Sequence, residues 1–290
     1  MNKRPSVCSY EECYESEAIS SFCDPSFHTQ KIIAEGDSWF TIGGLRLKNP
    51  WFSNILYTLR FQKQTLILNL AEPGDTLKHI SSIPKNHHFK SAIEEHTIEP
   101  WNAILLSAGG NDLIDKVHTL VLNKLERVGK TIDKPKDYCN LVAVDNFLNN
   151  IESHYRRLAA IRGVHDIPMI VHTYDYPTPN NSPSRFFGIG LLGPWLHPAM
   201  TNAEIPKNDW IALSDYLFDR LGNRLLALSK NPNRIPNFHV IDTRNTILRA
   251  KKNQTGESED WLNEIHPNKN GYKKIARLIE QQLKIVAGVN

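Results

Sequence analysis

The sequence has no long hydrophobic run. No segment approaches the roughly 20 apolar residues that a membrane-spanning helix needs. The first residues also lack the apolar stretch of about 7–15 residues that marks a secretory signal peptide. We therefore expect a cytoplasmic location, while export by a route that does not read such a signal stays open.

An excess of charge of one sign is also missing. The formal net charge is +3, and 22% of the residues are charged. No dense group of Lys and Arg with interleaved aromatic residues occurs, as a nucleic-acid-binding surface would require. We therefore expect no nucleic-acid partner.

Cysteine is scarce and its spacing fits no common site. The four cysteines are Cys8, Cys13, Cys23 and Cys139, and none forms a Cys-x-x-Cys pair. No zinc-binding pattern matches these spacings. Free thiols in a reducing compartment are the expected state, and a metal-binding knuckle or a redox device is the alternative.

Several catalytic motifs are absent as well. The chain contains no Gly-x-Ser-x-Gly, no phosphate-binding P-loop, no His-Glu-x-x-His and no dinucleotide-binding glycine pattern. We therefore infer no metal ion and no organic cofactor.

What the sequence does contain is an alternation of short apolar runs and longer amphipathic segments. The runs are short and apolar on both faces, which is typical of strands in a buried parallel sheet; they are residues 31–35, 65–70, 103–107, 167–172 and 238–241. The segments 140–162, 208–228 and 268–286 have apolar residues at helical spacing. This alternation predicts a three-layer α/β/α sandwich.

Two regions do not fit the alternation. Residues 1–30 show little periodicity, and we expect an N-terminal extension to a domain that covers 31–290. Residues 176–206 form a proline-rich insertion that also carries Phe186, Phe187 and Trp195. A segment of this length is often functional, so we expect its aromatic residues to form a wall or lid of a pocket. The alternative is that it only covers one end of the sheet.

Four short sequence sites stand at the ends of predicted elements, three after strands and one before a helix. Residues 36–39, Gly-Asp-Ser-Trp, follow the first strand, and Gly74 comes after the second. Asn111 comes after the third strand, and His266 precedes the last helix. Ligands bind at the carboxyl ends of parallel strands, so these residues are expected to lie together.

Taken in this order, the four sites resemble the SGNH hydrolases, also called GDSL esterases and lipases. The resemblance implies a flavodoxin-like parallel sheet of five strands. It also implies that Ser38 is the nucleophile and that His266 is its base. The oxyanion would be held by the N–H groups of Ser38 and Gly74 and by the side chain of Asn111.

The chain departs from the family pattern at two positions. Trp39 stands where the family name has Leu, and we regard Trp39 as a further candidate for the pocket wall. Asn263 stands where the family has the Asp that orients the histidine. We expect Asn263 to contact His266, although a carboxylate could serve instead, and the candidates are Asp242, Asp260 and Glu264.

The function implied by the resemblance is hydrolysis of a carboxylic ester, an acetyl group or another acyl group. The substrate would be a small-molecule or lipid ester, and neither its identity nor the oligomeric state follows from the sequence. The alternative is a binding or assembly module on the same fold whose chemistry is weakened by Asn263.

Overall fold

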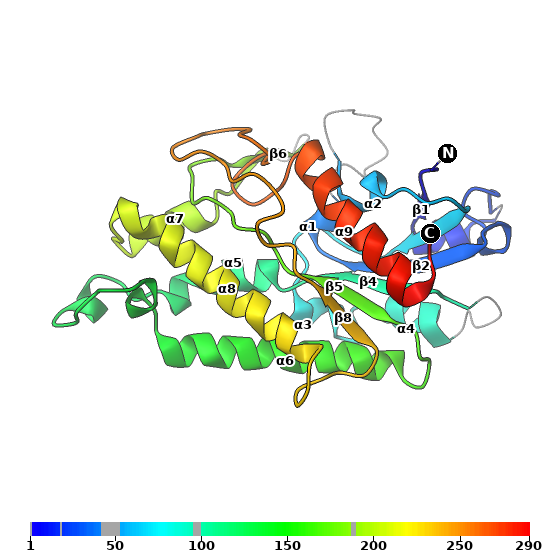
Figure 1. The fold of residues 1–290 in the computed structure, drawn as a ribbon, viewed down its shortest axis with the longest axis horizontal. Helices are drawn as coiled ribbons and strands as arrows, with labels where there is room; N and C mark the ends of the chain where they lie inside the picture. The colour runs from blue at the N-terminus through cyan, green and yellow to red at the C-terminus, as the bar shows by residue number, and fades with distance from the viewer. Residues whose placement is uncertain (1, 18, 42–52, 95–99, 187–189) are drawn as a thin grey trace.

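A computed structural model describes residues 2–17, 19–41, 53–94, 100–186 and 190–290. In these residues a parallel β-sheet lies between two layers of helices (Figure 1). The predicted α/β/α sandwich is therefore confirmed.

The central sheet contains all five of the predicted strands. They are β2 (Gln30–Gly36), β3 (Thr65–Asn69), β4 (Ala103–Ser107), β5 (Met169–His172) and β8 (Phe238–Ile241). Every pair of neighbouring strands is parallel, and the order is β1-β3-β2-β4-β5-β8. Because all strands run in one direction, their carboxyl ends meet along one edge of the sheet.

A sixth strand corrects the predicted count of five. Strand β1 (Ser6–Cys8) lies in the N-terminal extension and pairs with β3, so that Ser6 faces Leu66. It has only three residues, too few to show a period of two.

The expectation of free cysteines is wrong for two of the four. Cys8 and Cys23 form a disulfide, while Cys13 and Cys139 are buried thiols. Sequence spacing did not reveal this pair, because the contact depends on how residues 20–24 turn back toward β1.

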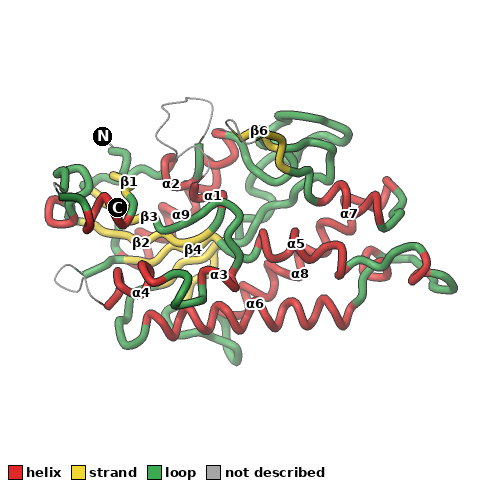
Figure 2. Tube along the Cα trace, turned by 180° about the vertical axis from the view of Figure 1, so that it is seen from behind, coloured by secondary structure: helices red, strands yellow, loops and turns green. Residues whose placement is uncertain are grey.

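Long and short helices together cover the two faces of the sheet. Helix α9 (Lys269–Ala287) packs on β5 and β8 and against α2 (Ile55–Thr58). On the other face lie α3 (Leu77–Ile80), α4 (His87–Glu94) and α6 (Leu141–Arg162), as Figure 2 shows from behind. Helix α8 (Trp210–Leu228) packs on α6 and β8, and α5 (Gly110–Leu120) also contacts α6.

Asparagine side chains begin two of the helices that the sequence predicted. Asn140 Oδ1 accepts the N–H of Ala143 at the start of α6. Asn268 Oδ1 accepts the N–H groups of Asn270 and Gly271 at the start of α9. Such N-caps satisfy amide groups that lack a partner within the helix.

Shorter elements connect the layers. They are α1 (Ser38–Thr41) and the single turns η1 (Glu11–Glu15), η2 (Pro25–Phe27), η3 (Leu125–Arg127), η4 (Pro135–Tyr138) and η5 (Lys207–Asp209). The insertion at 176–206 contains a hairpin of β6 (Ser184–Phe186) and β7 (Gly190–Leu192), followed by α7 (Leu196–Asn202).

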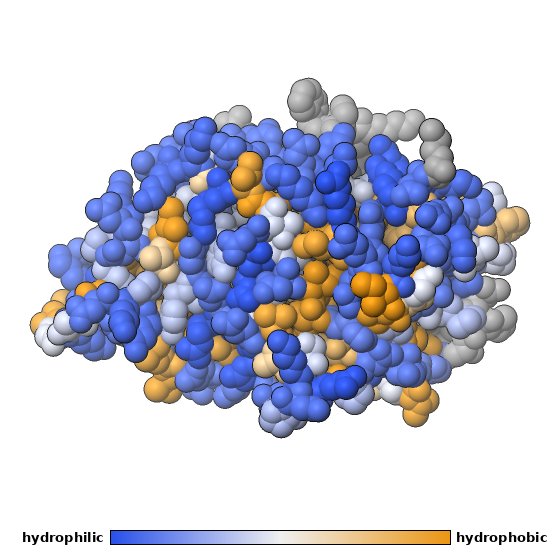
Figure 3. All heavy atoms as spheres, viewed as in Figure 1, coloured by the Kyte–Doolittle hydropathy of each residue, from blue (hydrophilic) through white to orange (hydrophobic). Residues whose placement is uncertain are grey.

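The surface in the view of Figure 3 is mostly hydrophilic, with apolar side chains in small separate groups. In the described part of the chain, no helix combines the length and apolar character needed to cross a membrane.

Candidate active site

Ser38 lies at the carboxyl end of β2, where it is the first residue of α1. The turn before it depends on Gly36, because a Cβ added there would lie 2.2 Å from the carbonyl oxygen of Ser107 on β4. The N–H of Asp37 donates to the same oxygen at 2.9 Å. Close approach of two strands therefore fixes the backbone that presents Ser38.

Asp37 holds this turn from inside the protein. Its side chain is 1% exposed and accepts hydrogen bonds from the Trp39 N–H, the Ser107 hydroxyl and the Tyr174 hydroxyl. Burial raises the pKa of Asp37 to about 6, although these three donors act in the opposite direction. Tyr174 fits because Gly110 has no side chain: a Cβ there would lie 2.7 Å from the ring.

His266 reaches Ser38 from the loop that precedes α9. Its Nε2 lies 2.9 Å from the Ser38 Oγ, and both side chains are buried, at 2% and 7% exposure. The structure thus brings together two residues that are 228 positions apart in the sequence.

Asn263 contacts the other nitrogen of the ring. Its Oδ1 lies 3.0 Å from His266 Nδ1 and also accepts the backbone N–H groups of Ile265 and His266. Only an oxygen can accept two N–H groups, so the backbone fixes which end of the amide faces the ring. Nδ1 must then carry the hydrogen, and the lone pair of Nε2 points to Ser38.

The three alternative carboxylates make their hydrogen bonds elsewhere. Asp242 binds Arg244 and the hydroxyl of Thr173. Asp260 binds the Leu248 N–H and the ammonium group of Lys274. Glu264 binds backbone N–H groups of the 176–206 insertion.

Burial dominates the electrostatics of the histidine. It lowers the pKa of His266 to about 3, because the protein interior disfavours the imidazolium. His266 is therefore neutral over most of the pH range, as a proton acceptor must be.

The two further candidates for an oxyanion site lie on neighbouring loops. Asn111 is the second residue of α5, and its Nδ2 donates to the carbonyl oxygen of Asp75 at 2.9 Å. Gly74 lies in the loop between β3 and α3 and has a φ of +84°. The N–H of Glu72 donates to the Gly36 carbonyl oxygen, which ties the loop after β3 to the turn that carries Ser38.

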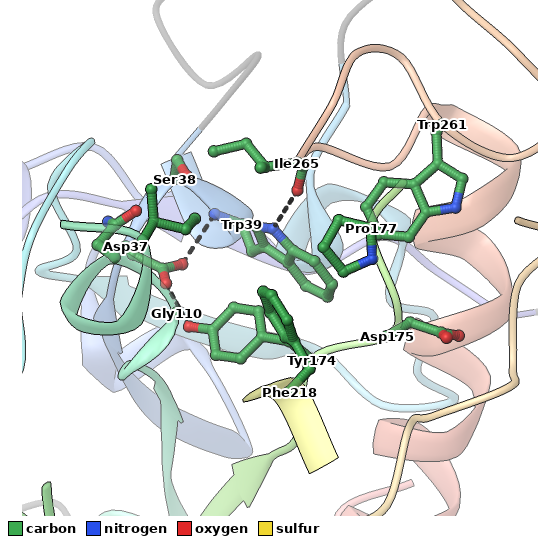
Figure 4. A pocket seen from close by; sticks show the side chains of 12 residues that line it. Asp37, Ser38, Trp39, Gly110, Tyr174, Asp175, Pro177, Phe218, Trp261 and Ile265 are labelled. Atoms are coloured by element: carbon green, nitrogen blue, oxygen red, sulfur yellow. Dashed lines mark hydrogen bonds between the residues drawn. The ribbon is translucent and has the colours of Figure 1, made fainter. Parts of the chain in front are cut away.

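A cavity opens beside Ser38 (Figure 4). Asn111 also lines it. The cavity volume of about 310 Å³ includes the part that is open to solvent. The walls are largely apolar, and they include Trp39, Ile114, Tyr174, Pro177, Phe218, Trp261 and Ile265.

The aromatic candidates from the sequence occupy different places. Trp39 is 3% exposed, and its indole N–H donates to the Ile265 carbonyl oxygen at 3.2 Å. The Trp195 ring lies edge-on to His266, with centroids 5.6 Å apart. Phe186 lies in β6, where only the backbone is described, and Phe187 lies outside the described residues.

Sequence reasoning missed the residues that support the site from behind. Tyr174 follows β5 and carries no motif of its own, and Glu264 was considered only as a possible partner of His266. Ser107 is the last residue of the predicted strand 103–107, but its contact with Asp37 depends on the pairing of β2 with β4.

Several solved structures are similar to this chain at low sequence identity. A GDSL-like lipase from Bacteroides thetaiotaomicron is 15% identical, with 88% of each chain covered and a TM-score of 0.40. An acetyl xylan esterase from Geobacillus stearothermophilus is 12% identical, with 88% of this chain and 95% of that chain covered and a TM-score of 0.42. A family 3 carbohydrate esterase from Clostridium thermocellum is 12% identical, with 89% and 99% covered and a TM-score of 0.42.

Comparison with curated proteins gave no match. The model of the GDSL-like Lipase/Acylhydrolase family matches residues 32–279, which include Ser38, Asn111 and His266. The chain belongs to this family.

Proposed function

We propose that this protein is a serine esterase in which Ser38 is the nucleophile and His266 its general base. The observation that carries the proposal is the 2.9 Å contact between His266 Nε2 and Ser38 Oγ, with Asn263 Oδ1 on the opposite ring nitrogen. This geometry meets the requirement for a nucleophile within hydrogen-bond reach of an oriented base.

In the reaction, Ser38 Oγ attacks the ester carbonyl carbon while His266 Nε2 takes the hydroxyl proton. The tetrahedral intermediate collapses when its bond to the alcohol oxygen breaks, and His266 returns the proton to that oxygen. Water then attacks the acyl group on Ser38 in the same way and releases the carboxylic acid. The steps use only this chain's residues and water.

The developing oxyanion would be held by the N–H groups of Ser38 and Gly74 and by Asn111. The Asn111 amide nitrogen carries two hydrogens, and one is engaged with Asp75. The second can serve the oxyanion, and one such donor is typically worth about 10²–10³ in rate.

The substrate would be a small-molecule or lipid ester with a modest acyl group. The enclosed part of the cavity is small, because it leaves only about 10 Å³ for the centre of a water-sized sphere, which is room for about one water molecule. Its apolar walls favour a hydrocarbon group and offer no basic surface for a nucleic acid.

In this proposal the hydrolase domain covers 31–290, and residues 1–30 are an extension that supplies the edge strand β1. The Cys8–Cys23 disulfide bears on location, because such bonds persist mainly in oxidising compartments. It favours export over the cytoplasmic location that the sequence predicts. Mass spectrometry of the native protein without reductant tests whether this bond forms.

A second candidate function is a binding or assembly module. The observation that favours it is the neutral Asn263 beside His266, since an Asp-to-Asn change in the triad of a serine protease lowers kcat by about 10⁴. A module of this kind would bind its ligand without acylation of Ser38.

Labelling with a fluorophosphonate separates the two functions, because this probe reacts only with an activated serine. The esterase is expected to be labelled at Ser38 and to hydrolyse members of a panel of acyl esters of graded chain length. Ser38→Ala should lower turnover by at least ~10³ with the fold intact, because a group that acts in the transition state is lost. Absence of labelling and of turnover in the folded protein would favour the binding module.

A further inference from the structure

The side chain of Glu264 is buried and points away from the catalytic histidine. It is 2% exposed, although it lies only two residues before His266. Its carboxylate accepts four backbone N–H groups, which come from Trp195, Leu196, His197 and Asn180. All four donors belong to the 176–206 insertion.

Three of these donors form the start of α7. No side chain of that segment caps the helix. Glu264 therefore supplies the cap from a distant part of the chain, and a carboxylate at a helix start is favoured by the helix dipole. The N–H of Glu264 also donates to the Ser182 carbonyl oxygen at 3.0 Å, so the loop and the insertion are joined by both backbone and side chain.

The attachment has a direct consequence for His266. Trp195, whose N–H is bound by Glu264, turns its ring edge-on to the imidazole, with an angle of 83° between the planes. His266 is 2% exposed in this arrangement. The same loop thus carries both the catalytic base and the anchor for the residue that packs on it.

We propose that Glu264 is a positioning residue that holds Trp195 against the His266 ring and keeps that ring away from water. This inference rests on the proposed function for its catalytic meaning. The contact between Trp195 and His266 does not depend on that function, and it can be measured without any assay of turnover.

Two measurements at pH 8 report on the hydrogen bonds of Glu264 and on the packing of Trp195 against His266. Burial raises the pKa of the Glu264 carboxyl to about 7, so the group is largely ionised there. Hydrogen exchange reports the N–H groups at 195–197, and modification by diethyl pyrocarbonate reports access of reagent to His266.

Glu264→Gln keeps the shape of the side chain but turns an NH₂ group toward some of the N–H donors. We expect exchange at 195–197 to become faster by ~10-fold or more, because hydrogen bonds to a charged acceptor are lost. We also expect faster modification of His266. Trp195→Ala should expose His266 to the same degree while α7 stays capped.

Asp175 provides a matched control. It is also a buried carboxylate that accepts four backbone N–H groups, from Tyr176, Asn245, Thr246 and Ile247. Asp175→Asn should speed exchange at 245–247 and leave 195–197 and His266 modification as they are.

Steady-state kinetics on a double-mutant cycle tests whether the contact also serves catalysis. Glu264→Gln and Trp195→Ala are each expected to lower kcat more than they raise KM, and the double variant should be little worse than either. Additive effects in the double variant would overturn the proposal, since the two residues would then act separately.

The proposal also fails if either variant leaves His266 modification at the wild-type rate. If Glu264→Gln does not fold, Trp195→Ala alone still decides whether Trp195 shields the ring. Should the shielding be found in a protein that is not labelled by a fluorophosphonate, the proposed esterase function fails and the positioning role stands.

Discussion

Asn263 Oδ1 lies 3.0 Å from His266 Nδ1, and two backbone N–H groups of the same loop fix this oxygen in place. The family pattern has a carboxylate at this position. An amide oxygen can select the same tautomer of the imidazole as a carboxylate does, but it cannot supply a negative charge to the imidazolium. The site therefore has the geometry of a Ser-His-acid triad with one charge fewer.

Restoring that charge should increase activity. We expect Asn263→Asp to raise kcat by at least ~10-fold, since the carboxylate stabilises the imidazolium formed during attack. Asn263→Ala should lower kcat, because the ring loses its orienting partner. Steady-state kinetics on a reactive acyl ester measures both, and Asn149→Asp adds the same charge on the exposed face of α6 as a control. If Asn263→Ala and Asn263→Asp both leave kcat unchanged, another residue orients His266.

The same substitution should move the pH profile. Burial lowers the pKa of His266 to about 3, so the ring stays neutral well below pH 6 and, in the proposed mechanism, is able to accept a proton there. A neighbouring carboxylate favours the protonated ring and raises its pKa. The acid limb of kcat/KM in Asn263→Asp is therefore expected at a higher pH than in the wild type. An unchanged or lower limb would contradict this account.

Trp39 should act on the reaction through the loop of His266. Trp39→Phe keeps an aromatic ring but removes the N–H that donates to the Ile265 carbonyl oxygen. A buried acceptor without a partner costs about 1–3 kcal/mol, and we expect kcat to fall while KM changes little. Trp101→Phe removes a similar bond, to Ala92, and should leave kcat unchanged. If Trp39→Phe instead shifts only the preferred acyl length, Trp39 acts as a pocket wall.

The sheet was predictable because its strands are buried on both faces, which leaves continuous apolar runs in the sequence. Strand β1 was not predictable, because three residues carry no pattern and because its pairing with β3 is a tertiary contact. The hairpin β6–β7 was not predictable either, because its strands have three residues each, too few to show a period of two.

The residues proposed to react could be named from the sequence because each follows a strand or precedes a helix at a recognisable motif. Their supports could not, because the partners lie far away in the sequence. Tyr174 is 137 positions from Asp37, and the N–H of His197 is 67 positions from Glu264. No local pattern encodes such contacts, and they exist only once the loops have been placed by the fold.

The disulfide should stabilise the protein without serving the reaction. Cys8 and Cys23 enclose a loop with a sequence separation of 15, and a loop of this size corresponds to about 3 kcal/mol in the chain-entropy model. The double variant Cys8→Ser, Cys23→Ser should unfold at a lower temperature, with kcat retained at 25 °C. Reductant should lower the Tm of the wild type and leave that of the variant as it is. Equal sensitivity of both would show that another group responds to the reductant.

His172 should make the stability of the protein depend on pH. The ring is 2% exposed and stacks on Trp39 beneath the site, and burial lowers its pKa to about 4. An unfolded chain binds a proton at this residue below pH ~6.5, while the folded protein does not until about pH 4. The free energy of unfolding is therefore at its full value above pH ~6.5 and falls as the pH is lowered toward 4.

His172→Phe keeps a ring against Trp39 and removes this titration. Between pH 7 and pH 5 the wild type should lose about 2 kcal/mol more stability than the variant, given about 1.4 kcal/mol for each pH unit. Urea unfolding at the two pH values measures the difference, and the other buried groups titrate equally in both proteins. His118→Gln, at an exposed position on α5, should behave as the wild type does. If His172→Phe lost as much stability as the wild type, His172 would already be protonated in the folded protein at pH 5, and burial would not hold it neutral.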